Sequence, residues 1–176
     1  PGLVDATVSP DGSRFTYVIA ESGNPDFGKG FTVEVSGGVP RPLCDECTVW
    51  GFLPDSHRAI VSDVRSIRFV GDNGAAQTVL TTPSNRIDRP SVSPDGRTIA
   101  FRISRGANYR TFVAPIPASG SVPQAMWTPI DEPTTTGRPC GWAPDSSTLY
   151  LLLDADGFRD LWGQKVDSAG RPAGMP

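Results

Sequence analysis

Short hydrophobic runs separated by polar turns recur along the whole chain. Four of them follow equivalent turns and are rich in β-branched or aromatic residues, at positions 14–20, 58–62, 98–103 and 148–153. Runs this short, bounded by turn residues, are typical of β-strands rather than helices. No segment carries the 3.6-residue apolar spacing of an amphipathic helix. The pattern therefore predicts an all-β chain.

A proline-aspartate corner precedes each of these four runs and reveals an internal repeat. The segment Val8–Gly12 recurs as Val92–Gly96, and in weaker form as Phe52–Ser56 and Trp142–Ser146. The corner prolines stand at positions 10, 54, 94 and 144, so the repeat is 40 to 50 residues long. Proline sets φ near about −65°, aspartate caps its own turn, and glycine at the fourth position supplies a positive φ. Serine replaces that glycine at Ser56 and Ser146, where we expect either strain or a different turn type.

Each repeat continues with further short runs. Second runs follow at 31–35, 66–70, 109–116 and 161–166, and short closing runs follow at 77–81 and 124–128. Four-stranded antiparallel units that repeat at this period, without helices, predict a β-propeller. A β-sandwich is the alternative, but it does not need the same turn at the same point of every repeat.

The corner and the strand after it resemble a known repeat. Ser-Pro-Asp-Gly followed by an Ile-Ala-Phe strand, clearest at Ser93–Phe101, is similar to the TolB-type, WD40-like β-propeller repeat family. The resemblance implies a single β-propeller domain over residues 1–176, with four-stranded antiparallel blades at about 1–43, 44–83, 84–129 and 130–176. The last of these lacks a convincing fourth strand after Val166. Propellers of this family usually have six or seven blades, so we expect these four to be a sector of a larger or oligomer-completed ring. Closure by four blades alone is the alternative.

These features favour binding over catalysis. The chain begins without methionine and in mid-pattern, so we expect a fragment of a larger bacterial protein. The resemblance implies a non-catalytic binding or protein-interaction module rather than an enzyme. It also implies a periplasmic or other extracytoplasmic location, or a cytoplasmic one if the propeller is attached to a regulator. The alternative is the substrate-gating propeller of a prolyl-oligopeptidase-like serine peptidase.

Charge and hydropathy narrow the range of partners. A net charge of −3 gives no overall attraction to nucleic acid, and no run of 18 apolar residues is present for membrane insertion. We therefore expect a protein or peptide partner, with no nucleic acid and no membrane insertion. An unclosed sector would expose apolar blade faces at both ends, so we also expect self-association into a homo-oligomer.

The candidate binding residues are arginines. Six arginines stand against two aspartates between positions 86 and 110, and converging guanidinium groups suit recognition of carboxylate or phosphate. In propellers, ligands usually bind at the edge opposite the corner turns, where Arg86, Arg89 and Arg105 are expected near Arg138. We predict these four as binding residues. The alternative is a solvated surface.

The segment 44–47, Cys-Asp-Glu-Cys, raises the question of thiol chemistry. Redox catalysis is disfavoured because two acids separate the cysteines and a strand-like run, rather than a helix, follows them, while a local disulfide or two free thiols remain open. Zinc would need Cys44, Cys47, Cys140 and His57 together, but a strand roughly 17 Å long separates Cys47 from the His57 turn. We therefore expect no metal site and interpret His57 as an exposed turn residue.

No catalytic or cofactor site is expected elsewhere. The segment Asp154–Asp160 begins like a calcium loop, but it lacks the later ligands of an EF-hand and fits a β-hairpin tip. The single histidine offers no nucleophilic triad, and an active site built on several metal-binding histidines, as in some lyases and lactonases, is disfavoured for the same reason. Neither a P-loop nor a dinucleotide-binding fingerprint is present, so we expect no cofactor.

Overall fold

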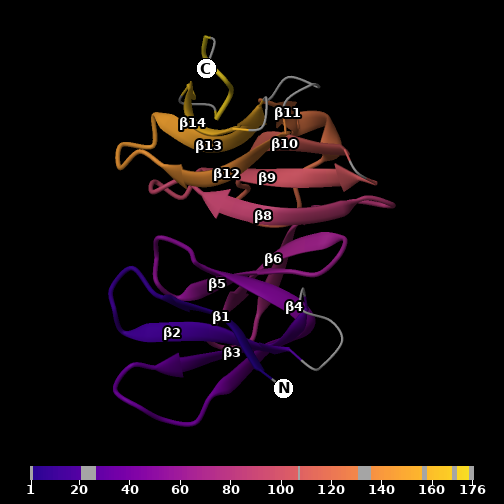
Figure 1. The fold of residues 1–176 in the computed structure, drawn as a ribbon. Helices are drawn as coiled ribbons and strands as arrows, with labels where there is room; N and C mark the ends of the chain where they lie inside the picture. Colours follow the sequence, from indigo (N-terminus) through magenta and orange to yellow (C-terminus); the bar gives the residue numbers. More distant parts are fainter. Residues whose placement is uncertain are drawn as a thin grey trace. The chain divides into compact units, whose positions relative to one another are not determined.

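The computed structural model describes residues 2–20, 27–106, 108–130, 136–155, 158–167 and 170–174, and its strands are labelled in Figure 1. Every element in these residues is a β-strand except one 3₁₀ turn at Gln124–Met126. The strands pair in antiparallel fashion. The prediction of an all-β chain with antiparallel sheets is confirmed. The chain divides into two compact units, unit 1 (Pro1–Thr81) and unit 2 (Thr82–Pro176), each described by itself.

Unit 1 is one seven-stranded sheet whose strands follow chain order. The long strand β4 (Arg41–Phe52) pairs with β3 through its first half and with β5 through its second half, so it joins the first two repeats. Cys47 and valines from both repeats form one buried apolar cluster, which stabilises this junction. The other strands are β1 (Gly2–Val8), β2 (Arg14–Ala20), β3 (Gly28–Glu34), β5 (Arg58–Ser62), β6 (Ser66–Gly71) and β7 (Ala76–Thr81).

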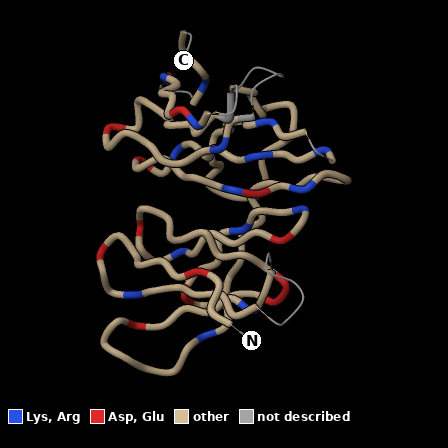
Figure 2. Tube along the Cα trace, in the orientation of Figure 1, with Lys and Arg blue, Asp and Glu red and all other residues tan. Residues whose placement is uncertain are grey.

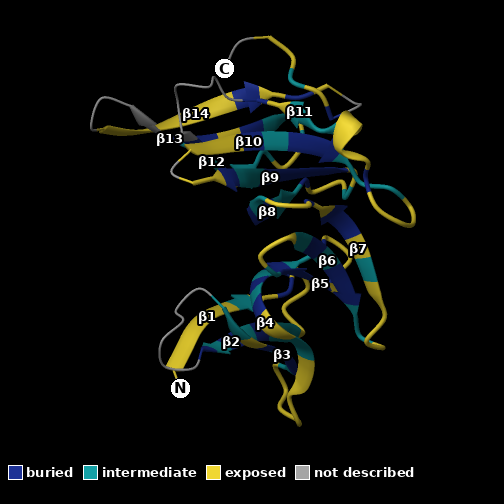
Figure 3. Ribbon diagram, turned by 90° about the vertical axis from the view of Figure 1, so that its right-hand side faces the viewer, coloured by how far each residue is buried: buried dark blue, intermediate teal, exposed yellow. Residues whose placement is uncertain are grey.

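Unit 2 contains a four-stranded sheet, in the order β11-β10-β9-β8, and a three-stranded sheet, β12-β13-β14. Three buried leucines of β13 pack with Ala100 and Val113 of the first sheet, so the two sheets share a core. Figure 3 shows β9 largely buried and β14 largely exposed. The strands are β8 (Arg86–Val92), β9 (Thr98–Arg105), β10 (Asn108–Pro115), β11 (Thr128–Pro129), β12 (Thr136–Trp142), β13 (Thr148–Ala155) and β14 (Phe158–Lys165).

The four corners share one backbone structure. Each joins the first strand of its repeat to the second, and the N–H of its fourth residue donates to the carbonyl of its first residue. The pairs are Gly12 to Ser9 at 2.9 Å, Ser56 to Leu53 at 3.0 Å, Gly96 to Ser93 at 2.8 Å and Ser146 to Ala143 at 2.9 Å. The fourth residue has a positive φ in every corner, including 63° at Ser56 and 62° at Ser146. The strain predicted at the two serines is therefore confirmed.

Two predicted features differ from the structure. The run 124–128 is a strand only at its end: Pro123 starts a 3₁₀ turn over Gln124–Met126, and the closing strand β11, which pairs with β10, begins at Thr128. The strand β4 runs through the predicted blade boundary between positions 43 and 44, because the last strand of the first repeat continues directly into the second repeat. In its described residues the fourth repeat has three strands and an isolated bridge between Val166 and Pro172, in line with its weak closing run. The blade ranges and the single-domain assignment stay predictions.

Candidate functional site

The four predicted binding arginines all lie in unit 2. Arg86 and Arg89 belong to β8, Arg105 ends β9, and Arg138 belongs to β12. Figure 2 shows basic positions beside an acidic one along β8. That acidic residue, Asp88, determines which arginines come together.

Asp88 is the buried centre of the arrangement. Its side chain is 6% exposed. It accepts hydrogen bonds from Nε of Arg102 at 2.8 Å and from Nη2 of Arg102 at 3.1 Å, and Nε of Arg86 lies 3.2 Å from its Oδ2. A buried carboxylate requires such partners because an unpaired charge away from water is costly. Asp88 therefore holds two guanidinium groups in fixed positions.

Strand register explains why these residues meet. Asp88 lies directly opposite Arg102 across β8 and β9, and Arg86 lies opposite Ser104, two positions further along each strand. Side chains two residues apart share a face of the sheet, so both arginines reach the same carboxylate. The guanidinium of Arg102 also stacks 4.3 Å from the ring centre of Tyr109. This cation–π contact further fixes its position.

Arg89 leaves the regular strand beside Asp88. The register of β8 against β9 shifts between Asp88 and Ser91, and Arg89 has a φ of 51°, a left-handed conformation that residues other than glycine rarely adopt. Burial is the largest influence on the pKa of the Arg89 guanidinium and lowers it. Repulsion from Arg102 and Arg138 lowers this pKa further, while Asp88 acts in the opposite direction. Several cations thus converge on one half-buried position.

The structure therefore brings Arg86 together with Arg102, which was not among the predicted residues, at Asp88, and Arg89 follows Asp88 along β8. Arg138, on β12, is linked to this group through its repulsion of Arg89. We call the set Arg86, Arg89, Arg102 and Arg138, with the carboxylate of Asp88, the arginine cluster. It draws on β8 and β9 of the third repeat and β12 of the fourth repeat. Within the described residues it places several guanidinium groups around one carboxylate.

Arg105 stands apart from this cluster. It is exposed, and the alternation of side chains along β9 puts it on the face opposite Arg102. No hydrogen bond or ion pair in the described part of the chain joins it to Asp88. Sequence reasoning also overlooked the roles of Asp88 and Arg102, which it counted only as charges. The two-residue spacing of Arg86 and Asp88 on one strand was the signal for their shared face.

A second charged cluster lies in unit 1, beside the second corner. Arg14 forms an ion pair with Asp72, and Nε of Arg14 lies 3.3 Å from Oε1 of Glu34. The hydrogen bond to Asp72 is the main cause of a raised pKa at Arg14. His57 Nδ1 lies 3.3 Å from Oδ2 of Asp72, and its side chain is 65% exposed, which confirms an exposed turn residue. These contacts link the first repeat to the second and indicate a stabilising role.

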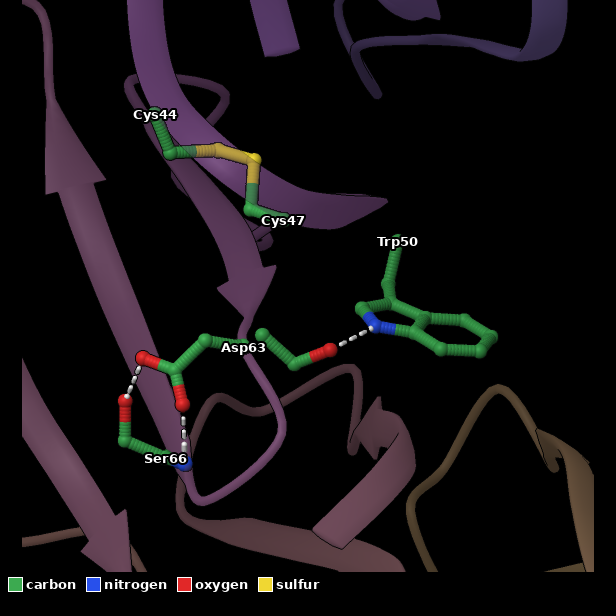
Figure 4. Close-up of a disulfide and its surroundings, with 6 residues drawn as sticks. Cys44, Cys47, Trp50, Asp63 and Ser66 are labelled. Carbon is green, nitrogen blue, oxygen red and sulfur yellow. Dashed lines mark hydrogen bonds between the residues drawn. A yellow bond between two sulfur atoms is a disulfide. The ribbon is translucent and has the colours of Figure 1, made fainter. Parts of the chain in front are cut away.

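Cys44 and Cys47 form a disulfide within β4 (Figure 4). This bond decides between the two thiol states that the sequence left open. It lies against Gly30, where a Cβ would be 2.9 Å from Sγ of Cys44, so a larger residue does not fit there. The bonded sulfurs are not available to zinc, and the third cysteine, Cys140, is a free exposed thiol. Among the described residues, no group of three or more His, Cys, Asp or Glu side chains is placed to hold a metal ion.

The surroundings of the disulfide contain further polar contacts. Figure 4 shows the indole N–H of Trp50 donating to a hydroxyl, that of Ser62, at 2.7 Å. The carboxylate of Asp63 accepts hydrogen bonds from the backbone N–H of Ser66 at 2.7 Å and from its hydroxyl at 2.5 Å. The two bonds between Asp63 and Ser66 close the hairpin between β5 and β6.

The remaining sequence candidates lie at hairpins and loops. Asp154–Asp160 joins β13 to β14, where Ala155 pairs with Phe158, so it is a β-hairpin. Positions 156–157 at its tip lie outside the described residues, as do positions 21–26 and 131–135. No helix in the described part of the chain has the length and apolar character to cross a membrane.

Comparison with known proteins identifies similar folds. No protein-family model matches the chain. An uncharacterized protein of Agrobacterium fabrum is 28% identical over 173 residues, which cover 89% of this chain and 54% of that protein. Among solved structures, a protein described as TolB from Agrobacterium tumefaciens has a TM-score of 0.69 and 23% identity, over 95% of this chain and 62% of that one. Prolyl oligopeptidase B from Galerina marginata has a TM-score of 0.68 and 15% identity, over 98% of this chain and 28% of that one.

These likenesses concern the fold. The chain has the all-β, antiparallel architecture of propeller-containing structures and resembles the TolB and prolyl oligopeptidase propeller regions. It spans about half the length of the curated relative, 62% of the Agrobacterium tumefaciens structure and 28% of prolyl oligopeptidase B. A fold shared by binding proteins and peptidases does not determine an activity.

Proposed function

We propose that the chain is part of a non-catalytic β-propeller of a larger bacterial protein, and that it binds a protein or peptide partner through the arginine cluster. The likeness to propeller-containing structures supports the architecture. The observation that carries the binding role is the pairing of Arg86 and Arg102 with the buried carboxylate of Asp88, directly beside the half-buried Arg89. Arginine is enriched at protein interfaces because its planar, multidentate guanidinium makes directed bonds at a modest desolvation cost.

The cluster is well suited to an interface because rigid elements hold it. Asp88 and Arg102 sit on adjacent paired strands, and Arg138 lies on β12 next to Gly137. The carbonyl of Gly137 accepts a 2.6 Å hydrogen bond from the buried hydroxyl of Thr111 on β10. Side chains that start from such fixed strands lose little further freedom on binding, which favours affinity.

We also propose a periplasmic or other extracytoplasmic location. The Cys44–Cys47 disulfide supports it, because disulfides persist in oxidising compartments and are rare in the cytosol. A cytoplasmic location, with the propeller attached to a regulator, is the alternative. Sequencing the complete gene and fractionating the source cells would distinguish the two.

The binding role is tested by partner capture with matched variants. The 176-residue chain is immobilised and exposed to an extract of the source organism, in parallel with Arg89→Glu, Arg138→Glu and the control Arg97→Glu. Arg97 is an exposed arginine of the third corner, so its reversal makes the same change in net charge outside the cluster. We expect the parent and the control to retain the same partner and the two cluster variants to lose it. Equal capture by all four proteins, or no partner for any of them, contradicts the proposal.

A second candidate function is the substrate-gating propeller of a prolyl-oligopeptidase-like serine peptidase. Its support is the similarity to prolyl oligopeptidase B over 98% of this chain. Under this candidate the complete gene encodes an α/β-hydrolase domain with a Gly-x-Ser-x-Gly elbow. A complete gene without such a domain removes the candidate.

Self-association is a further proposal about partners. The edge strand β14 exposes Phe158 and Leu161, and the edge strand β1 exposes Leu3 and Val4. Exposed apolar edges of this kind favour pairing with another polypeptide. Light scattering over a concentration series is expected to give a mass that rises above 18.7 kDa, whereas a constant monomer mass argues against self-association.

A further inference from the structure

We propose that the outer face of the first sheet of one copy packs on the outer face of the β12-β13-β14 sheet of a second copy. The inference rests on the self-association proposed above and names the two surfaces that meet. Each unit already contains such an interface between its own two repeats, and the first and last repeats each expose one half of it.

The interface between repeats is built alike in both units. The strand after each corner points alternate side chains to opposite sides of its sheet. The later repeat contributes the fifth and seventh residues after its corner proline to a shared buried cluster, and the earlier repeat contributes the sixth or the eighth. These residues are Leu149 and Leu151 with Ala100 in unit 2, and Ala59 and Val61 with Val18 in unit 1. Odd positions therefore face the preceding repeat, and even positions face the following repeat.

The first repeat exposes the half that faces a preceding repeat. Phe15, Tyr17 and Ile19 are the fifth, seventh and ninth residues after its corner proline, and all three are half-exposed, whereas the residues between them are buried. Phe31 of β3 stacks on Tyr17 with the ring centres 5.4 Å apart, so it lies on the same side. With two exposed residues of β1 that pair with β2 on this side, they form the first face: Leu3, Val8, Phe15, Tyr17, Ile19 and Phe31.

The fourth repeat exposes the half that faces a following repeat. Its sixth and eighth residues after the corner proline are Tyr150 and Leu152. Tyr150 is 38% exposed, whereas the equivalent residue of the third repeat, Ala100, is fully buried. Leu161 of β14 pairs with Leu152 and is 65% exposed. These three residues, Tyr150, Leu152 and Leu161, form the last face.

A second copy supplies the missing half of each interface. Its first face presents the positions that the leucines of β13 use against the third repeat, and its last face presents the position that Ala100 uses. Gly163, which pairs with Tyr150, stands where the third repeat has Val113, so the larger side chain at 150 is matched by a smaller one at 163. Contact between the faces brings Tyr17 and Tyr150 into an apolar interface, which favours association.

The two faces are different surfaces, so the contact is head-to-tail. A copy that uses its first face keeps its last face free for another copy. Assemblies larger than a dimer are therefore expected. Contact between two like faces would instead stop at a dimer.

The test mixes two variants that each lack one face. Tyr17→Lys places a charge on the first face, and Tyr150→Lys places one on the last face. Both residues lie on inner strands of their sheets, β2 and β13, so neither substitution changes a free sheet edge. A charge without a partner in a packed interface is costly. Met126→Lys, in the exposed 3₁₀ turn, is the control with the same change of charge outside both faces.

Sedimentation velocity on the 176-residue chain measures the assemblies. The parent and Met126→Lys are expected to associate beyond a dimer. Each face variant alone is expected to stay a monomer of 18.7 kDa at concentrations about tenfold above those at which the parent associates. An equimolar mixture of the two face variants is expected to form a dimer and nothing larger, because one intact first face meets one intact last face. That dimer also establishes that both variants are folded.

A second pair of variants guards against misfolding. Val8→Lys and Leu161→Lys change residues of the two faces that are 61% and 65% exposed, so the fold depends little on them. The same mixing result is expected. Absence of a dimer in both mixtures overturns the inference.

The remaining outcomes separate this contact from other kinds of association. Assembly of Tyr17→Lys or Tyr150→Lys alone at the level of the parent overturns the head-to-tail contact, while the proposed self-association stands and is assigned to the strand edges. A parent that stays a monomer refutes the self-association and this inference together. Binding through the arginine cluster is decided separately, by partner capture with the Arg89→Glu and Arg138→Glu variants.

Discussion

The backbone N–H of Asp11 donates a 3.1 Å hydrogen bond to the hydroxyl of Ser56, although the two residues lie in consecutive corners 45 positions apart. The same bond recurs in unit 2, where the N–H of Asp95 donates to the hydroxyl of Ser146 at 3.0 Å. In both units the serine occupies the corner position that glycine occupies in the preceding repeat. The strained serine is thus also the link between neighbouring corners.

This relationship predicts different effects on stability for two substitutions of Ser56. Ser56→Ala retains the positive φ and removes the acceptor of the Asp11 N–H, so the free energy of unfolding is expected to fall by about 1–2 kcal/mol. Ser56→Gly also loses the bond but relieves the strain, and the net change is expected to stay within about 0.5 kcal/mol. Urea denaturation measures both values. Ser119→Ala, in an exposed loop, is the control and is expected to match the parent.

The outcome distinguishes the hydroxyl link from simple strain. If the strain alone mattered, Ser56→Ala would be neutral and Ser56→Gly would be stabilising. Such a pair of results would contradict the role given to the serine hydroxyl.

The corner aspartates predict that stability falls in acid. The hydrogen bond from Ser9 is the largest cause that lowers the pKa of Asp11, from 3.8 to about 2, and bonds from Ser13 add to it. A carboxyl whose pKa is lower in the folded state stabilises the fold above its unfolded value, and this contribution disappears as pH falls through the folded value. We therefore expect the thermal midpoint to fall between about pH 4 and pH 2.

A single variant tests this assignment. The pKa is also lowered at the other three corner aspartates, Asp55, Asp95 and Asp145. At Asp55 and Asp95 burial is the largest single influence and raises the pKa, but hydrogen bonds and a nearby arginine together outweigh it. Asp11→Asn removes one titrating group, so its thermal midpoint is expected to depend less steeply on pH than that of the parent in this window. Parallel curves for the two proteins would show that Asp11 does not contribute.

The Cys44–Cys47 disulfide is expected to stabilise the fold modestly. It closes a loop of only four residues, for which the chain-entropy relation gives about 2 kcal/mol at 25 °C. Reduction with dithiothreitol is expected to lower the free energy of unfolding by about that amount, measured by urea denaturation. The Cys140→Ser variant, which lacks the free exposed thiol, should show the same loss. In a variant that lacks both Cys44 and Cys47, dithiothreitol should not change the free energy of unfolding. A decrease as large as that of the parent would mean that the reductant acts on another group.

Arg89 predicts a conflict between stability and binding. Arg89→Gly relieves the positive φ and removes one member of a repulsive set, whereas Arg89→Ala removes the charge but retains the strain. We expect the glycine variant to be more stable than the alanine variant by about 0.5–1 kcal/mol in urea denaturation. Both are expected to lose the captured partner. A glycine variant no more stable than the alanine variant would mean that the backbone at this position is not strained.

The fold could be predicted from the sequence because the residues that specify each element are close together along the chain. Each corner needs only proline, aspartate and a residue with positive φ, and the strand after it needs only a short apolar run. The 3₁₀ turn at Gln124–Met126 escaped detection because a short run after Pro123 has no periodicity that separates a turn from a strand. The disulfide was one of two open alternatives, because pairing depends on how β4 bends between its two partner strands.

The candidate site could be predicted only in part because it depends on contacts between strands. Local charge excess pointed to Arg86 and Arg89, which adjoin the same carboxylate in the structure. Arg102 was left out because its role arises from the register of β9 against β8, which places it opposite Asp88. Arg105 belongs to the same arginine-rich segment, but its side chain lies on the opposite face of β9 from Arg102. The number of arginines in a segment does not show on which face each one lies.

The most direct measurement of the proposed binding role is a nuclear magnetic resonance titration that observes the arginine Nε–Hε groups of the isotope-labelled protein. The signals are assigned through single Arg→Lys variants. As the captured partner is added, the signals of the arginine cluster are expected to shift progressively, and the signal of Arg97, on the exposed corner, is expected to stay in place. Unchanged signals of the cluster, or equal shifts of every arginine signal, would contradict binding through the arginine cluster.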